Sequence, residues 1–319
     1  MERKEFNLNP FVNLDPVEYY GLLEIVNINY QNLLRGFLEG KLGNLDEVCL
    51  ILTGSDGKRE RHCQSRTEII IIGNNQSLVL GTREEIGKIF GENGVPLESN
   101  PSDCLPEGRT LDENLSYAYN NRELVYPDRV LHSQFLIGSK EIYQQAILKV
   151  LDEIITDGRI YDHVRRQLND YKKAFREGDY RGQTIFSWGD GIQWYEENKD
   201  PKLSRLGFKM GPLRAVQRKL DVITFKALRH DDQLKGKIRE RYVEGGLSNT
   251  LVRIEFLSQI GLIPEDLKNK LIEAYYWFLQ QYHQAQENYK QTRRPVELAF
   301  DIDLGDYHRG IIEKFLEIK

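Results

Sequence analysis

Strand-like and helix-like patterns occupy separate parts of this sequence, and this separation limits the folds open to it. Two short apolar runs, Val48–Thr53 and Thr67–Ile72, are continuous rather than alternating, as in strands covered on both faces. A third strand is predicted at Val95–Glu98. Further along, apolar residues recur every three or four positions, as on one face of a helix. The pattern predicts an α+β protein, with a small mixed-sheet domain over residues 1–140 and an all-helical bundle over residues 141–319.

Helical periodicity places the main helices of both halves. A run of turn-forming residues separates two of them, and we expect a long structured loop over Gly178–Gly211. Helices are predicted over Asp15–Phe37, Arg83–Phe90, Ile142–Ile154, Leu213–Leu228, Leu251–Ile260 and Leu267–Tyr282. The 319 residues suffice for two such domains, each with its own core.

Composition narrows the classes of function. The chain has 44 Lys and Arg against 49 Asp and Glu, a net charge of −5. This balance argues against general nucleic-acid binding, because that affinity comes chiefly from neutralised phosphates. No apolar run approaches the ~18 residues of a membrane span, and the charged start of the chain is unlike a secretory signal. We therefore expect a cytoplasmic protein without a membrane or nucleic-acid partner.

The segment between the first two predicted strands carries the chemistry. It reads Gly54-Ser-Asp-Gly-Lys-Arg-Glu-Arg-His-Cys-Gln-Ser-Arg-Thr-Glu68. A strand that ends in Gly-Ser and runs into a helix start brings unpaired backbone N–H groups and a hydroxyl toward a phosphate. Ser55 would supply the hydroxyl, Gly54 and Gly57 would let the backbone approach closely, and Lys58 would add a positive charge.

These residues form a recognisable pattern: Gly54-Ser55-x-Gly57-Lys58-x-Glu60, four residues, then Ser65-x-x-Glu68. It resembles the G-[GS]-x-G-R-x-E-x4-S-D-x-D signature of the DNA polymerase β-like nucleotidyltransferase superfamily. The most similar variants are bacterial uridylyl- and adenylyltransferases that modify signalling proteins, and CBS-linked nucleotidyltransferase-like proteins. Weaker likenesses to the CBS-linked proteins follow in the expected order: Glu98–Pro101, a short helix at Asp128–Gly138, a cleft segment at Lys209–Arg214 and the substrate-binding helices at Asn249–Gln286.

The resemblance implies transfer of a nucleoside monophosphate from a nucleoside triphosphate to a protein or small-molecule acceptor. In that family the two acids of S-D-x-D point to one face of a strand and hold Mg²⁺. By this likeness Glu68 is a metal ligand and a catalytic residue together with Ser65, and Glu60 supports the motif. Lys209 and Arg214 would approach the phosphates from the bundle.

The sequence departs from the signature at the first acid, where Arg66 stands. A guanidinium cannot bind Mg²⁺ and keeps its proton, so two-metal catalysis of the usual kind is not expected. Lys58 replaces the usual Arg, and Ala215 stands where an acid commonly follows. Glu98 and Asp103 are the nearest candidates for a third ligand.

Three interpretations of Arg66 stay open. In the first, the site has decayed and Arg66 is a solvated charge, which leaves an interaction scaffold. In the second, Arg66 and Glu68 share a face and bind nucleotide phosphates without a metal, which makes the protein a nucleotide sensor and a pseudoenzyme. In the third, Asp56 or Glu60 has replaced the lost acid and the protein is an active transferase.

Overall fold

The computed structural model describes residues 14–43, 45–61, 65, 67–94, 109–121, 124–180, 183–184, 208–292 and 302–318. Arg66, the predicted strand at Val95–Glu98 and the candidate ligand Asp103 lie outside these residues, as does most of the predicted loop over Gly178–Gly211. The first elements in chain order are α1 (Pro16–Glu39), β1 (Val48–Leu52), α2 (Gly54–Gly57), β2 (Ile69–Gly73), α3 (Gln76–Glu92), α5 (Leu111–Asn121), α6 (Val125–Leu131) and β3 (Gln134–Gly138).

Helices dominate the rest of the described chain. They follow as α7 (Lys140–Thr156), α8 (Arg159–Glu177), a short hairpin of β4 (Asp179–Tyr180) and β5 (Gln183–Thr184), the π-helical turn η2 (Lys209–Leu213), α10 (Arg214–His230), α11 (Asp232–Val243), α12 (Thr250–Gln259), α13 (Glu265–Thr292) and α14 (Ile302–Glu317). None of the described helices is long and apolar enough to cross a membrane.

A three-stranded sheet with the order β2-β1-β3 forms the centre of the N-terminal part. Both strand pairs are antiparallel, with Leu50 opposite Ile71 on one side and opposite Ile137 on the other. The described strands therefore form an antiparallel sheet and not the mixed sheet that the sequence predicts. The third strand, β3, was not predicted: Asp128–Gly138 was expected to be a short helix, but helix α6 ends at Leu131 and the chain then extends along β1.

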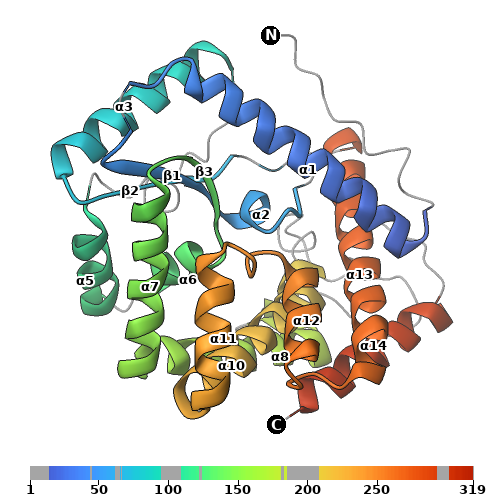
Figure 1. The fold of residues 1–319 in the computed structure, drawn as a ribbon. Helices are drawn as coiled ribbons and strands as arrows, with labels where there is room; N and C mark the ends of the chain where they lie inside the picture. The colour runs from blue at the N-terminus through green and yellow to red at the C-terminus, as the bar shows by residue number, and fades with distance from the viewer. Residues whose placement is uncertain are drawn as a thin grey trace.

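The two faces of the sheet are covered by different helices, as the continuous apolarity of β1 and β2 predicts. Leu50 and Leu52 pack with α1 and α3, whereas the alternate residues Cys49 and Ile51 pack with α5, α6 and α7. Figure 1 shows α1 and α3 on one side of the sheet and α7 on the other. Because α7 begins at Lys140, the apolar packing runs across the predicted boundary after residue 140, and that boundary stays a prediction.

Helix α1 connects the sheet to the helical part. Asp15 accepts a hydrogen bond from the N–H of Val17 at 2.9 Å, and Gly40 follows the last turn, in agreement with the predicted start and end. The C-terminal half of α1 packs on the sheet through Leu34 and Leu38. Its N-terminal half reaches the bundle, where Tyr19 and Leu23 are part of the hydrophobic core of the helical bundle. The helix therefore extends from β3 to α13 (Figure 1).

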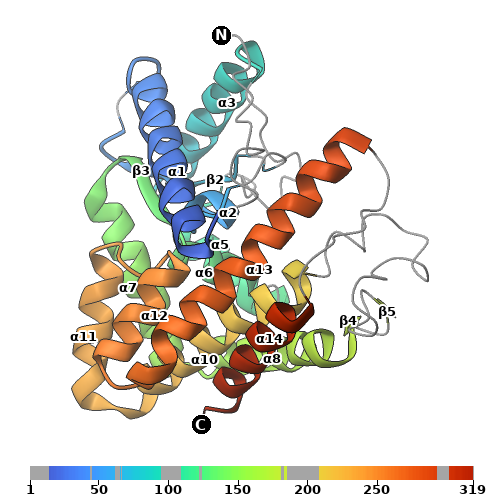
Figure 2. The same cartoon turned by 90° about the vertical axis from the view of Figure 1, so that its right-hand side faces the viewer.

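The helical bundle confirms the periodic segments and adds helices that periodicity did not indicate. The helices at α7, α10, α12 and α13 match the predicted segments, and α8, α11 and α14 are new. The turn η2 packs against α8 and α13, and helix α10 packs against α8, with α14 lying across α13 (Figure 2). Lys209 begins η2 and Arg214 begins α10, and Gln217 in the first turn of α10 accepts a hydrogen bond from Lys58, the residue after α2.

Candidate functional site

The turn after β1 has the geometry that its glycines predict. Gly54 begins the single helical turn α2 with a φ of +63°. An ideal Cβ on Gly54 would lie 2.2 Å from Oε2 of Glu68, so the Glu68 carboxylate lies directly over this residue. Ser55 donates a hydrogen bond through Oγ to Oγ of Ser65 at 3.1 Å. The structure thus brings the Gly-Ser turn and the second acid of the motif together.

Gly57 is required by a second close approach. A Cβ there would lie 2.5 Å from the carbonyl oxygen of His132 and 2.8 Å from that of Leu52. Both glycines therefore have a role in protein packing, whereas the sequence suggested close approach to a phosphate. Because α2 lies against the end of α6, residues 128–132 are part of the surroundings of the motif.

Lys58 and Arg214 are joined by one side chain. Nζ of Lys58 donates to Oε1 of Gln217 at 2.9 Å, and Nη1 of Arg214 donates to the same oxygen at 3.1 Å. The two cationic nitrogens therefore lie within about 6 Å of each other, where at an effective dielectric constant near 20 like charges repel by about 3 kcal/mol. The sequence placed both residues at a phosphate, and the structure places them side by side.

The surroundings of Lys58 and Lys209 disfavour their charged forms. Burial, followed by the charge of Arg214, lowers the pKa of Lys58 to about 7. Burial and Arg214 also lower the pKa of Lys209 to about 8, although Glu68 opposes the shift. Arg129, on α6, is a further positive neighbour of Lys209. A group of buried or half-buried cations of this kind is suited to an anionic ligand, which would favour their protonated forms.

Glu60 and Asp56, the acids considered as replacements for the lost ligand, are both engaged elsewhere. Oε1 of Glu60 accepts from the hydroxyls of Thr250 and Tyr275, each at 2.7 Å, and Oε2 accepts from Nε2 of Gln217 at 3.1 Å. Asp56 is 1% exposed and pairs with Nη1 of Arg61 at 2.7 Å.

Burial raises the pKa of the Asp56 carboxyl, although Arg61 opposes that effect. Its second oxygen accepts from the N–H of Glu68 at 3.4 Å. Both replacement acids therefore fit a structural role better than metal binding.

Mg²⁺, the ion that the family resemblance implies, does not fit the donor set well. Of Glu68, Glu98 and Asp103, the carboxylates that the family likeness suggests as ligands, Glu68 lies within the described residues. Its Oε2 lies 3.8 Å from Nη1 of Arg129, and Lys209 is a further positive neighbour. A pair of magnesium ions needs several oxygen ligands, whereas this carboxylate has cations around it.

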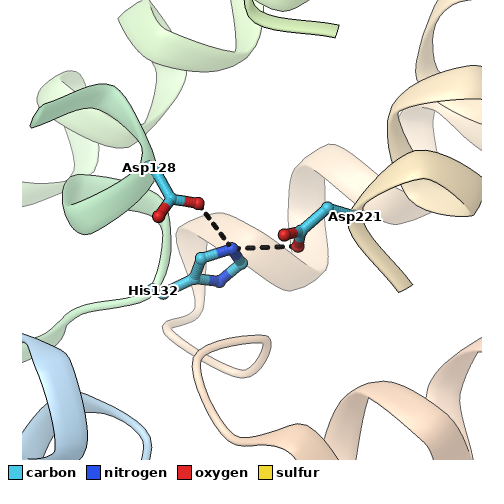
Figure 3. Close-up of side chains that lie close together, drawn as sticks. All are labelled: Asp128, His132 and Asp221. Atoms are coloured by element: carbon cyan, nitrogen blue, oxygen red, sulfur yellow. Dashed lines mark ion pairs between the residues drawn. The ribbon is translucent and has the colours of Figure 1, made fainter. Parts of the chain in front are cut away.

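A second polar group lies directly behind the motif. Nε2 of His132 is 3.0 Å from Oδ1 of Asp221 and 3.4 Å from Oδ1 of Asp128. Figure 3 shows the two carboxylates, one on α6 and one on α10, turned toward the same imidazole nitrogen. The three ligand atoms lie within 4.8 Å of one another, so the group could hold a metal ion.

Two arginines already balance the charge of this group. Arg218 contacts both carboxylates, with Nη2 at 2.8 Å from Oδ2 of Asp128 and Nη1 at 2.8 Å from Oδ2 of Asp221. Arg253 also pairs with Asp221. Burial lowers the pKa of His132, although Asp221 opposes that shift. Two carboxylates, two guanidiniums and a neutral imidazole sum to zero, so the formal charges of the group balance without a cation.

The pKa values of the two carboxyls agree with this pairing. Burial alone would raise them, but the charge of Arg218 holds the pKa of Asp128 below its usual range. The charge of Arg253 likewise holds the pKa of Asp221 well below its usual range against the effect of burial. Both acids are therefore ionised at neutral pH, as salt-bridged groups.

A hollow of about 510 Å³ lies at the other end of β1, away from the motif. Three carboxylates, those of Glu39, Asp46 and Glu141, are among its lining residues, and no lysine or arginine is. The rest of the lining consists of Leu42, Gly43, Leu45, Ile137, Gly138 and Ser139. Its charge does not suit a phosphate, and it is not the site that the sequence predicted.

Sequence reasoning missed Gln217, Arg129, Asp128, His132 and Asp221. The segment Asp128–Gly138 drew attention only as a weak family likeness, and its acid, base and arginine were not singled out. Gln217 lies three residues, about one helical turn, after Arg214. Within the helix predicted over Leu213–Leu228, this spacing places the two side chains on the same face, and it is the signal by which Gln217 could have been found. Neither the protein-family models nor the curated proteins compared with this chain give a match.

Proposed function

We propose that this chain binds the phosphate groups of a nucleoside triphosphate where α2, the start of β2 and η2 meet, and that it does so without two-metal catalysis. One observation carries the proposal: Lys209 and Arg214 are far from Lys58 in the sequence, yet all three lie together beside the Gly54-Ser55 turn. Their mutual repulsion is relieved by an anion. The resemblance to nucleotidyltransferases suggests which anion.

The arrangement favours a nucleotide-binding protein over an active transferase. Glu60 and Asp56 are hydrogen-bonded within the fold, and Glu68 has Arg129 and Lys209 as neighbours. These contacts leave positive charge, rather than a set of metal ligands, to meet the phosphates. The protein would then act as a sensor of nucleotide, with any acceptor protein recognised as a binding partner and left unmodified.

Calorimetry without magnesium tests this proposal. ATP and UTP, each with EDTA, are expected to bind wild-type protein and to bind Lys209→Ala at least about tenfold more weakly, because a hydrogen bond to a charged group contributes about 1.5–3 kcal/mol. Arg66→Ala should weaken binding too, if Arg66 shares the face of Glu68. Lys237→Ala, on the exposed surface of α11, is the control and should bind as wild type does.

Two results would contradict the proposal. One is that no nucleotide binds in EDTA while binding appears on addition of Mg²⁺ or Mn²⁺. The other is transfer of label from a nucleoside triphosphate, labelled in its α-phosphate and base, to a protein or small molecule in the presence of either ion. That second result would restore the transferase interpretation.

A further inference from the structure

One buried carboxamide occupies the centre of the proposed phosphate site. Gln217 lies in the first turn of α10 and is 5% exposed. Its Oε1 accepts from Lys58 and Arg214, at 2.9 and 3.1 Å. Its Nε2 donates to Oε2 of Glu60 at 3.1 Å and to the hydroxyl of Tyr275 at 2.7 Å. A carboxamide offers two acceptor sites and two donors, so its whole capacity is used.

The charges on either side fix the orientation of this carboxamide. Two cations face the oxygen, and a carboxylate and a hydroxyl face the nitrogen. Rotation by 180° would place the NH₂ group against Lys58 and Arg214 and the oxygen against Glu60, which loses the hydrogen bonds to the charged groups. Glutamine suits this position because it is neutral and both donates and accepts.

We infer that Gln217 is the positioning residue of the phosphate site: it holds Lys58 and Arg214 side by side and ties them to helix α13 through Tyr275. The nature of the ligand rests on the proposed function, whereas the positioning role rests on the hydrogen bonds. Because Lys58 and Arg214 are cationic side chains suited to oxyanions, the site recognises the phosphate chain. Inorganic tripolyphosphate is therefore a sufficient probe.

The charges that face Lys58 make its titration a direct readout. Glu60 and Asp128 favour its charged form, and Arg214 and Arg218 on α10 disfavour it. Gln217→Glu would add a carboxylate within hydrogen-bond reach, which should raise the pKa of Lys58 well above about 7. Gln217→Met has a similar size but no acceptor, and should lower that pKa further.

The experiment measures two quantities for the whole chain. One is the pKa of Lys58 without ligand, by NMR of ¹³Cε-labelled lysine with Lys58→Arg for assignment. The other is the affinity for tripolyphosphate in EDTA, by calorimetry, between pH 6.5 and 9. Gln233→Met, in an exposed position on α11, is the matched control. Circular dichroism identifies any variant that does not fold, in which case the other Gln217 variant decides.

The positioning role predicts that the pKa of Lys58 moves in opposite directions in Gln217→Glu and Gln217→Met. Both variants should bind tripolyphosphate at least tenfold more weakly, and the fall of affinity with rising pH should start at higher pH in Gln217→Glu. An unchanged Lys58 pKa in the folded variants would overturn the inference, even if affinity fell. If wild type binds no tripolyphosphate, the proposed function fails, and the Lys58 pKa alone decides the positioning role.

Discussion

At the residue scale, the motif is held by contacts that leave no room for a side chain at its first glycine. Gly54 has a positive φ and the Glu68 carboxylate lies over it. Sequence reasoning singled out Gly54 as a position of close approach to a phosphate, because a Gly-Ser turn after a buried strand is a local pattern. It did not identify Glu68 as the group in contact, since that contact joins the two ends of a segment of fifteen residues.

Gly54→Ala is expected to destabilise the protein by about 1–2 kcal/mol from the left-handed conformation alone, and by more because its Cβ displaces Glu68. In the double variant Gly54→Ala/Glu68→Ala, part of the lost stability should return, because the carboxylate that the new Cβ displaces is absent. Gly87→Ala is the control: it lies within α3 with no neighbour within 4 Å of an added Cβ. It should raise stability by about 0.5–1 kcal/mol.

Urea denaturation of the four variants measures these differences. Additive effects of Gly54→Ala and Glu68→Ala would show that the two side chains do not compete for the same space, and would contradict the close approach.

At the scale of the elements, the group around His132 joins three helices. Asp128 comes from α6, Asp221 and Arg218 from α10, and Arg253 from α12. The residues lie about 90 and 30 positions apart in the sequence, so no spacing or periodicity could have brought them together. The same holds for Gln217, whose partners Glu60 and Tyr275 lie 157 and 58 residues away.

Asp221→Asn should reduce the free energy of unfolding by about 3–5 kcal/mol, because it leaves Arg218 and Arg253 buried beside a neutral group. Asp232→Asn is the control, since Asp232 is exposed at the start of α11 and its substitution should leave the stability close to that of wild type. Chemical denaturation measures both. Added Zn²⁺ should leave the wild-type midpoint unchanged, and a clear increase would show that the group binds metal after all.

At the scale of the whole molecule, buried histidines make stability depend on pH. Burial lowers the pKa of His132, lowers that of His283 to about 3 and lowers that of His308 to about 4. As the pH falls, these imidazoles take up a proton near pH 6.5 in the unfolded chain and only at lower pH in the folded protein. Stability should therefore fall as pH drops below 6.5, by up to about 1.4 kcal/mol per pH unit for each histidine.

Below pH 3.8 the carboxyls of Asp128 and Asp221 should add to this loss, because their folded pKa values are lowered and the unfolded chain binds protons first. Urea denaturation at intervals from pH 7 to 3 measures the slope of stability against pH in both ranges. His283→Gln should reduce that slope by about one proton, although it loses the hydrogen bond with Tyr19. Parallel curves for wild type and variant would contradict a neutral, buried His283.

The sequence alone determined what depends on near neighbours in the chain. Val48–Leu52 and Ile69–Gly73 are buried strands because continuous apolar runs need cover on both faces, and α1 begins and ends at its capping residues. Tertiary structure decided the rest. β3 became a strand because its backbone could pair with β1, and Lys58 and Arg214 lie together because Gln217 on α10 accepts a hydrogen bond from each. Such contacts depend on the energy of the assembled fold, which no local pattern records.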